Sequence, residues 1–172
     1  MIVRRETPAD VAAVREVVGA AFASAERSGP VDEVVLLDAL RECDGWLPAL
    51  SHVALEGDDV VGHVVCTRAE VGGRPVLGLG PLSVRPDRQG RGVGSALMHS
   101  VLGAADALDE PLVVLLGHAD YYPRFGFRPA EQFGITPPVP EWREHFQALP
   151  LSAYDEGLRG PFVYAEPFRR FG

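Results

Sequence analysis

The sequence predicts a single α/β domain over residues 1–172, in which a central mixed, mostly antiparallel sheet carries helices on both faces. Three observations predict this class. Two segments with apolar residues at helical spacing open the chain, and three extended segments joined by tight turns follow them. A long amphipathic helix then precedes the wholly apolar run 112–116, which is typical of a buried central strand. The strands on either side of that helix are expected to be parallel.

The predicted helices have recognisable ends. We expect the first to begin near Thr7, because threonine caps a helix and Pro8 suits the first helical position. Apolar residues then recur at helical spacing as far as Phe22. The second helix is predicted over about 31–42, and the third, which leaves a glycine-rich turn, over about 91–108.

Turn residues separate the predicted strands. Gly57-Asp58-Asp59 divides the first two strands, and Gly72-Gly73 divides the second from the third. The tyrosine-rich segment 120–126 is predicted as a short helix that Gly126 closes in the left-handed conformation. The strands, in chain order, are predicted over about 51–56, 60–69, 75–84, 112–116, 146–151 and 161–168.

The amino-acid composition argues against several classes of binding partner and cofactor. A net charge of −8 argues against binding to nucleic acid or to an anionic membrane, and no apolar run is long enough to span a bilayer. Two cysteines and an N-terminus without a signal-peptide pattern predict a cytoplasmic protein. All 16 basic residues are arginine, which excludes a lysine Schiff base and a P-loop lysine. The histidines lack metal-ligand spacing, so we expect no metal.

The turn that precedes the third helix is the strongest site signal. Gln89-Gly90-Arg91-Gly92-Val93-Gly94 fits Gln/Arg-x-x-Gly-x-Gly/Ala, and its glycines allow the backbone to approach an anion closely. Unpaired N–H groups and the helix dipole attract a phosphate, and Arg88 and Arg91 add positive charge. A dinucleotide-binding turn has a different glycine spacing. We therefore expect a phosphorylated ligand; the alternative is a glycine-rich turn without a ligand.

Two segments of the chain resemble one known family. Leu79-Gly80-Pro81-Leu82-Ser83-Val84-Arg85-Pro86, leading into the glycine-rich turn, resembles the acetyl-CoA motif of the GCN5-related N-acetyltransferases. Tyr121-Tyr122-Pro123-Arg124-Phe125-Gly126-Phe127 resembles the family's Tyr-x-x-x-Gly-Phe segment after the fifth strand. The order of elements fits as well, so the resemblance covers most of the chain. Within the family, the chain is most similar to the YhbS-like predicted acetyltransferases, whose acceptors are poorly defined.

The resemblance implies an enzyme that transfers an acetyl group from its cosubstrate acetyl-CoA directly to an amine on a small molecule or peptide, as a monomer or homodimer. It implies a sheet splayed at the fourth strand, where a bulge at Gly80-Pro81 makes room for the thioester. Tyr122 takes the place of the acid that protonates the CoA thiolate, and a one-residue shift would give that role to Tyr121. The N–H of Leu82 or Ser83 would polarise the thioester. The residues implied in acetyl-CoA binding are Leu82, Ser83, Val84, Arg88, Gln89, Gly90, Arg91, Gly92, Val93, Gly94 and Ser95.

The general base is the point at which the sequence departs from the family pattern. The glutamate that many members carry on the central strand falls at Gly80, which has no side chain. Tyr122 favours an enzyme, whereas the missing carboxylate leaves open a non-catalytic acyl-CoA sensor or an interaction module on the same fold. The alternatives for the base are Glu26, Glu70, His63, His118 or a chain of water molecules.

Overall fold

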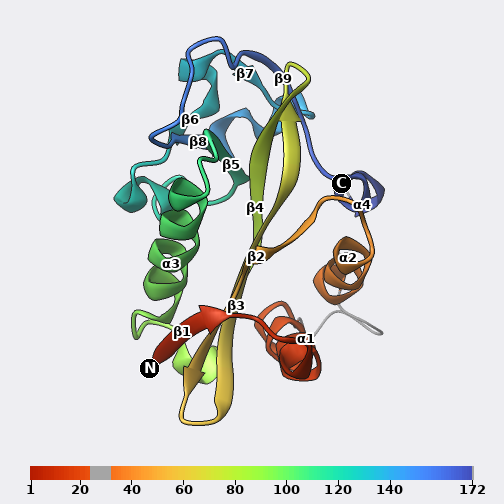
Figure 1. The fold of residues 1–172 in the computed structure, drawn as a ribbon, viewed down its shortest axis with the longest axis vertical. Helices are drawn as coiled ribbons and strands as arrows, with labels where there is room; N and C mark the ends of the chain where they lie inside the picture. The colour runs from red at the N-terminus through yellow and green to blue at the C-terminus, as the bar shows by residue number, and fades with distance from the viewer. Residues whose placement is uncertain (24–31, 172) are drawn as a thin grey trace.

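A nine-stranded mixed sheet runs the length of the molecule (Figure 1). The computed structural model describes residues 1–23 and 32–171. The strands follow the order β1–β2–β3–β4–β5–β8–β6, and β9 pairs with β3 and with β7. Along this order every pair is antiparallel except β4–β5, which is parallel. The predicted mixed, mostly antiparallel sheet is confirmed.

The helices and strands are spread over the whole chain. The strands are β1 (Ile2–Arg5), β2 (Trp46–Glu56), β3 (Asp59–Val71), β4 (Arg74–Val84), β5 (Leu112–Leu116), β6 (Arg128–Pro129), β7 (Ile135–Thr136), β8 (Phe146–Pro150) and β9 (Gly160–Val163). The α-helices are α1 (Val11–Ala21), α2 (Asp32–Arg41), α3 (Val93–Ala107) and α4 (Glu166–Phe171). The 3-10 helices are η1 (Pro8–Asp10), η2 (Pro86–Arg88), η3 (Tyr122–Phe125), η4 (Ala130–Phe133) and η5 (Pro140–His145).

Helices cover both faces of the sheet, as predicted. Figure 1 shows α3 on one face and α1, α2 and α4 on the other. Leu97 of α3 is buried in one cluster with Val64 of β3, whereas Leu37 of α2 is buried in another with Val65. Successive side chains of a strand point to opposite faces, so β3 supplies apolar residues to both layers.

The first helix begins as the sequence predicts. Thr7 is the N-cap of η1, Pro8 is its first residue, and η1 leads directly into α1. The Asp10 carboxylate accepts a hydrogen bond from the Thr7 N–H (2.8 Å) and pairs with Arg4 of β1 (2.7 Å). The hydrogen bond from Arg4 is the largest cause that lowers the pKa of Asp10, to about 2. These contacts tie the edge strand to the first helix.

The structure differs from the sequence-based expectations at both ends of the chain. No strand is predicted at the N-terminus, yet β1 pairs with β2 along its whole length. The predicted strand 161–168 is wrong beyond Val163, because α4 begins at Glu166. Pro167 lies in the first turn of α4, where a missing N–H costs nothing. Strand β2 also begins earlier than the predicted residue 51.

Helix α3 lies close to the sheet because Gly62 of β3 has no side chain. A Cβ at this position would lie 2.8 Å from Leu97 Cδ1 and 2.9 Å from Val93 Cγ1. Both of these leucine and valine side chains are buried. The close approach at Gly62 therefore fixes the first turns of α3 against β3.

We expect Gly62→Ala to lower the free energy of unfolding by about 1–3 kcal/mol, because the added methyl group overpacks the contact with α3. Gly103→Ala is the matched control. Gly103 lies within α3, and a Cβ there would meet no atom within 4 Å. Alanine is the better helix former by about 0.5–1 kcal/mol, so the control should be neutral or stabilising. Urea unfolding of both variants measures the difference, and equal effects would contradict the packing argument.

Candidate functional site

Strands β4 and β5 separate halfway along β4. They pair only at Leu77–Val113 and Gly78–Val114. Beyond these pairs, the register between β3 and β4 shifts, so that Gly80 and Pro81 together oppose a single residue of β3. The Gly80–Pro81 peptide is cis, and Gly80 has a φ of 137°. The predicted bulge is confirmed, and it opens a gap in the sheet beside the second half of β4.

The register of β4 decides which backbone groups face this gap. The Arg85 N–H donates to the Val61 carbonyl of β3 (2.8 Å). Because N–H groups alternate in direction along a strand, the N–H of Ser83 also points toward β3. The backbone groups of Leu82 and Val84 therefore point away from β3, toward the gap. The Val84 carbonyl accepts a hydrogen bond from the Gln89 side chain (3.1 Å).

A pocket of about 490 Å³ lies between the second half of β4 and the start of α3. All of the residues predicted for donor binding line it except Ser83 and Arg91. Tyr121 and Arg124 line it as well, and the sequence reasoning did not place them there. The signal for Arg124 was its basic side chain within the tyrosine-rich motif. The lining residues are Leu82, Val84, Arg88, Gln89, Gly90, Gly92, Val93, Gly94, Ser95, Tyr121 and Arg124.

Glycines shape the floor of this pocket. Gly90 and Gly92 have φ values of 75° and 84°, in the left-handed region that favours glycine. A Cβ on either residue would meet no atom within 4 Å, so the space above both is open. Gly92 is the N-cap of α3 and provides no side-chain cap. The first N–H groups of this 15-residue helix therefore need an external acceptor, and the helix dipole favours an anion.

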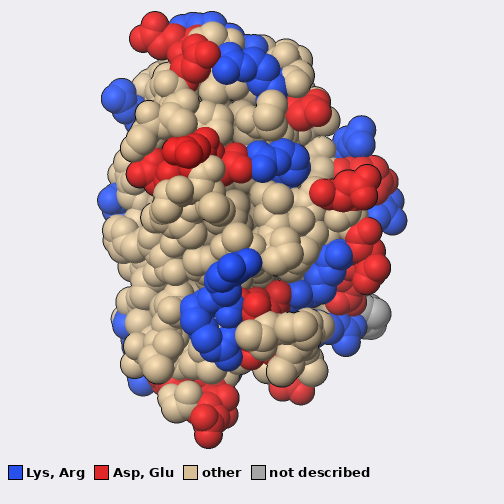
Figure 2. All heavy atoms as spheres, viewed as in Figure 1, with Lys and Arg blue, Asp and Glu red and all other residues tan. Residues whose placement is uncertain are grey.

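The arginines near the pocket differ in their existing partners and in their exposure. Arg88 is already paired with Glu56 (2.7 Å) and Asp87 (2.9 Å). Arg124 donates to the Tyr121 carbonyl (2.8 Å) and lies over the Tyr121 ring, 4.4 Å from its centroid. Arg91 is exposed. Figure 2 shows acidic and basic side chains interspersed on the face that it views. The local N–H groups and the individual arginines are the groups at this pocket that can attract an anion.

Two adjacent tyrosines follow β5 beside the gap. The Tyr121 hydroxyl lies near α3, at 3.0 Å from the position of a Cβ on Gly94. The Tyr122 ring covers Gly117, where a Cβ would collide with it, and packs edge-on against Phe127 (6.0 Å between centroids). Burial raises the pKa of Tyr122 to about 12, so this phenol keeps its proton at neutral pH. The tyrosine rings contact each other edge-to-face at 4.9 Å.

The sequence-based candidates for the general base differ in burial and in position. His63 is fully buried, and burial lowers its pKa to about 4, so it is neutral at pH 7. Glu70 is exposed on the part of β3 that pairs with β9. His118 is exposed and lies just beyond the end of β5. Glu26 lies outside the described residues.

His63 belongs to a buried polar cluster under α2. Its Nε2 is 2.8 Å from Ser51 Oγ, which also donates to Glu6 (3.1 Å). Arg41, at the end of α2, donates to the Glu6 carboxylate through its two terminal guanidinium nitrogens, Nη1 and Nη2 (2.6 and 2.5 Å). Ser83 faces His63 across the β3–β4 ladder. Within the described residues, neither the Ser83 hydroxyl nor His63 Nδ1 has a hydrogen-bond partner. The cluster joins β2 and β3 to α2 and to the residue after β1.

Among residues 1–23 and 32–171, no three side chains of His, Cys, Asp or Glu converge in a way that would hold a metal ion. In this described part of the chain, no helix has the length and apolar character required to cross a membrane.

A splayed sheet with a glycine-lined pocket at a helix N-terminus defines a class of acyltransferase. Residues 48–129 match the family model of the acetyltransferase (GNAT) domain. The chain is also 36% identical over 166 residues to YjhQ of Escherichia coli K12, an uncharacterized N-acetyltransferase, with 92% of this chain and 88% of the relative covered. The chain belongs to the GCN5-related N-acetyltransferase family.

Solved structures of the same family match almost the whole chain. A GNAT family acetyltransferase from Brucella melitensis, in complex with acetyl-CoA, is 33% identical with a TM-score of 0.79, and 97% of each chain is covered. YhbS from Escherichia coli, in complex with CoA, is 30% identical with a TM-score of 0.88. That match covers 99% of this chain and 93% of YhbS.

We expect acid to destabilise the protein through His63. Its pKa is about 4 when folded and about 6.5 when unfolded, so the unfolded state binds the proton more tightly. Stability is therefore complete above pH ~6.5 and falls by up to ~3 kcal/mol as the pH falls to ~4. Urea unfolding at several pH values measures this loss. His63→Gln should remove this part of the pH dependence, whereas the exposed His99→Gln should retain it. An unchanged slope in His63→Gln would contradict the assignment.

Proposed function

We propose that this protein transfers the acetyl group of acetyl-CoA to a primary amine, by direct attack in a ternary complex. The observation that carries the proposal is the open glycine cradle at the N-terminus of α3, placed beside the gap between β4 and β5. The bound acetyl-CoA and CoA of the two similar structures support the same choice of ligand. Cytoplasmic location and a monomer or homodimer remain predictions.

The cradle is proposed to hold the pyrophosphate of acetyl-CoA. The residues from Gln89 to Ser95, apart from Arg91, line open space at the positive end of α3, and phosphate oxygens would supply the acceptors that the first N–H groups of this helix need. Arg124 lines the pocket and adds a cation, whereas the guanidinium of Arg88 is partly neutralised by its two acidic partners. Arg91 is proposed to act from the exposed rim.

The gap in the sheet is proposed to hold the pantetheine arm and the thioester. The backbone groups of Leu82 and Val84 face the gap and would pair with the amides of the arm. Of the two donors suggested for the thioester oxygen, the register favours the N–H of Leu82, because that of Ser83 points toward β3. A fixed N–H aimed at the developing oxyanion lowers the barrier without reorganisation.

Tyr122 is proposed to protonate the departing thiolate. It stands four residues before Gly126, as in the family motif, and its ring lies over Gly117 beside the gap. A pKa of about 12 keeps the phenol protonated until the C–S bond breaks. Burial also raises the pKa of the CoA thiol, which makes the departing thiolate a stronger base toward the phenol. Tyr121, which lines the donor pocket, is the alternative acid.

The amine must lose a proton when its nitrogen attacks. His63 is unsuited as a base because it is fully buried with a pKa of about 4. His118 and water that reaches the gap are the two routes that we propose for this proton. The absence of a side chain at Gly80 favours a second candidate function, a non-catalytic acyl-CoA sensor. Formation of N-acetylated product separates the enzyme from the sensor.

We expect calorimetry to show acetyl-CoA binding in the low micromolar range or tighter, and Gly92→Ala to weaken it by about tenfold or more. The new methyl group would occupy the open cradle and strain a left-handed residue. Gly73→Ala is the matched control, because Gly73 has a similar φ of 82° and open space but lies in the β3–β4 turn. Figure 1 shows that turn at the opposite end of the molecule from the start of α3. No binding by the parent protein at millimolar acetyl-CoA would overturn the proposal.

We expect Tyr122→Phe to lower kcat by about 100-fold or more while leaving the KM for acetyl-CoA unchanged, because only proton transfer is lost. Tyr121→Phe should have a small effect on kcat. The measurement is the rate of CoA release with an amine that the parent enzyme acetylates. If Tyr121→Phe has the large effect instead, the roles of the two tyrosines are exchanged. If both variants keep the parent rate, neither tyrosine is the acid.

A further inference from the structure

A second pocket reaches the β4 bulge from the face that carries α1, α2 and α4. Its volume is about 290 Å³, at the lower end of the range for ligand sites. Gly80 and Pro81 of the bulge and Leu116, the last residue of β5, line one side of it. These residues border the gap where the thioester is proposed to lie. An amine in this pocket would therefore reach the thioester carbon from the side opposite α3.

The walls of this pocket are almost entirely apolar. Four of the side chains that line it are aromatic, and Glu33 of α2 is the one charged side chain among the described lining residues. An acceptor with many hydroxyl groups would lose hydrogen bonds to water here without replacement. An apolar group that packs against these aromatic side chains is favoured instead, because its burial removes apolar surface from water. The apolar lining residues include Phe22, Leu36, Leu79, Trp142, Tyr164 and Phe168.

Tyr164 fixes the aromatic wall to the point where the strands separate. Its hydroxyl lies next to the backbone of Leu116. Its ring lies against Gly78, the last residue of β4 that pairs with β5, where a Cβ would be 3.2 Å from two ring carbons. Phe168 of α4 stacks on the other side (4.5 Å between centroids, 27° between planes), and Trp142 meets Tyr164 edge-on at 6.4 Å. The wall is therefore built before any acceptor arrives.

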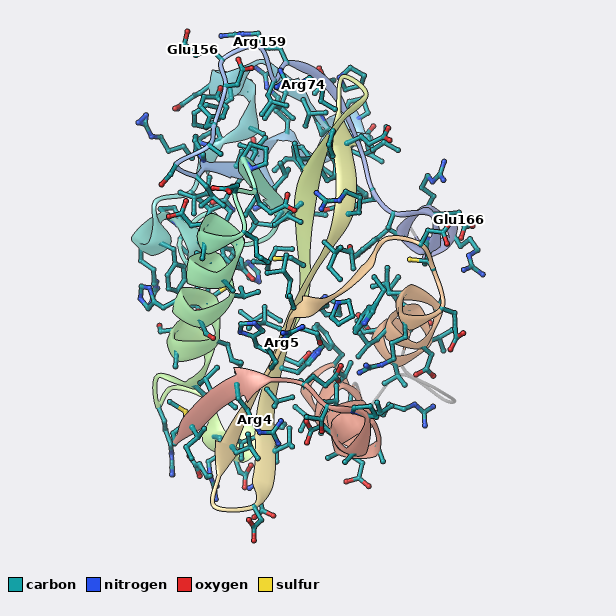
Figure 3. All side chains as sticks on the ribbon, viewed as in Figure 1. Arg4, Arg5, Arg74, Glu156, Arg159 and Glu166 are labelled. Carbon is teal, nitrogen blue, oxygen red and sulfur yellow. The ribbon has the colours of Figure 1, made fainter. Side chains whose placement is uncertain are left out.

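Helix α4 brings Phe168 to this wall, and Figure 3 shows α4, marked by its label Glu166, beside α2. A larger recess of about 630 Å³ lies nearby, between α2, β3 and α4. Charged residues line much of that recess, among them Arg68, Glu70 and Arg169, and no residue of the β4 bulge lines it. It therefore does not compete with the apolar pocket for an acceptor that must touch the thioester.

We propose that the acceptor is a small primary amine whose nitrogen is joined by a short chain to one aromatic or branched aliphatic group. This inference rests on the proposed function and adds the substrate class. The apolar group lies against Trp142, Tyr164 and Phe168, and the amine points to the gap. The neutral amine nitrogen attacks the thioester carbon, the C–S bond breaks, and the electron pair leaves on sulfur. The thiolate takes the proton of the tyrosine, and the proton of the amine restores the phenol through water.

The test compares amines that differ in the group attached to the nitrogen. Purified protein with saturating acetyl-CoA is given phenethylamine, isoamylamine, spermidine, kanamycin or a tripeptide that begins with phenylalanine. Thiol release and mass spectrometry of the product give kcat/KM for each. We expect the two apolar amines to exceed spermidine and kanamycin by about tenfold or more. Higher kcat/KM for either polycation, or for the tripeptide, would overturn the inference while the proposed function stands.

Variants test whether this pocket is responsible. Trp142→Ala should raise the KM for phenethylamine about tenfold and leave the KM for acetyl-CoA unchanged. Phe133→Ala, which removes an aromatic side chain that contacts Tyr154 and does not line the pocket, is the matched control. Equal behaviour of Trp142→Ala and its control, or acetyl-CoA binding with no acetylation of either apolar amine, would refute the inference. Failure to bind acetyl-CoA would instead refute the proposed function itself.

Discussion

The separation of β4 from β5 beyond Gly78 is the constraint on which both pockets depend. One extra residue in β4 at Gly80–Pro81 shifts its register against β3 and ends its pairing with β5. The backbone groups of Leu82 and Val84 are thereby left to face a gap instead of a neighbouring strand. The glycine-lined pocket meets this gap from the α3 face and the aromatic pocket meets it from the other face. If β4 and β5 were paired along their whole length, ligands bound on the two faces of the sheet could not contact each other.

Two contacts that involve β3, the strand next to β4, keep these faces in place. Gly62 allows α3 to approach β3, which sets the helix N-terminus beside β4. On the other face, Arg41 at the end of α2 donates hydrogen bonds to the Glu6 carboxylate. Ser51 and His63 belong to the same buried cluster. That cluster holds α2, and with it Glu33 of the aromatic pocket, over the sheet. Positioning of this kind is the main contribution that a fold makes to a direct transfer between two bound substrates.

Local patterns predicted the parts of the site that lie close together in sequence. Three parts of the site need a special backbone conformation, and glycine or proline in the sequence indicates each of them. They are the glycine-rich turn, the bulge at Gly80–Pro81 and the turn at Gly126. The same local reasoning could not predict how segments far apart in the sequence pack together. The sequence predicted a strand over 161–168, but the chain divides there into β9 and α4. The four-residue strand β1 was missed because it is too short for a periodic pattern.

By itself, the sequence determined the family, the mixed sheet and most of the residues that line the glycine-rich pocket, because these depend on local backbone requirements and on the order of elements. Only the tertiary structure decided that Leu82 and not Ser83 faces the gap, since strand register sets the direction of each N–H. It also decided which face of the sheet carries the aromatic wall. Trp142 comes from η5, whereas Tyr164 and Phe168 follow β9, and packing beside the β4–β5 gap brings these segments together.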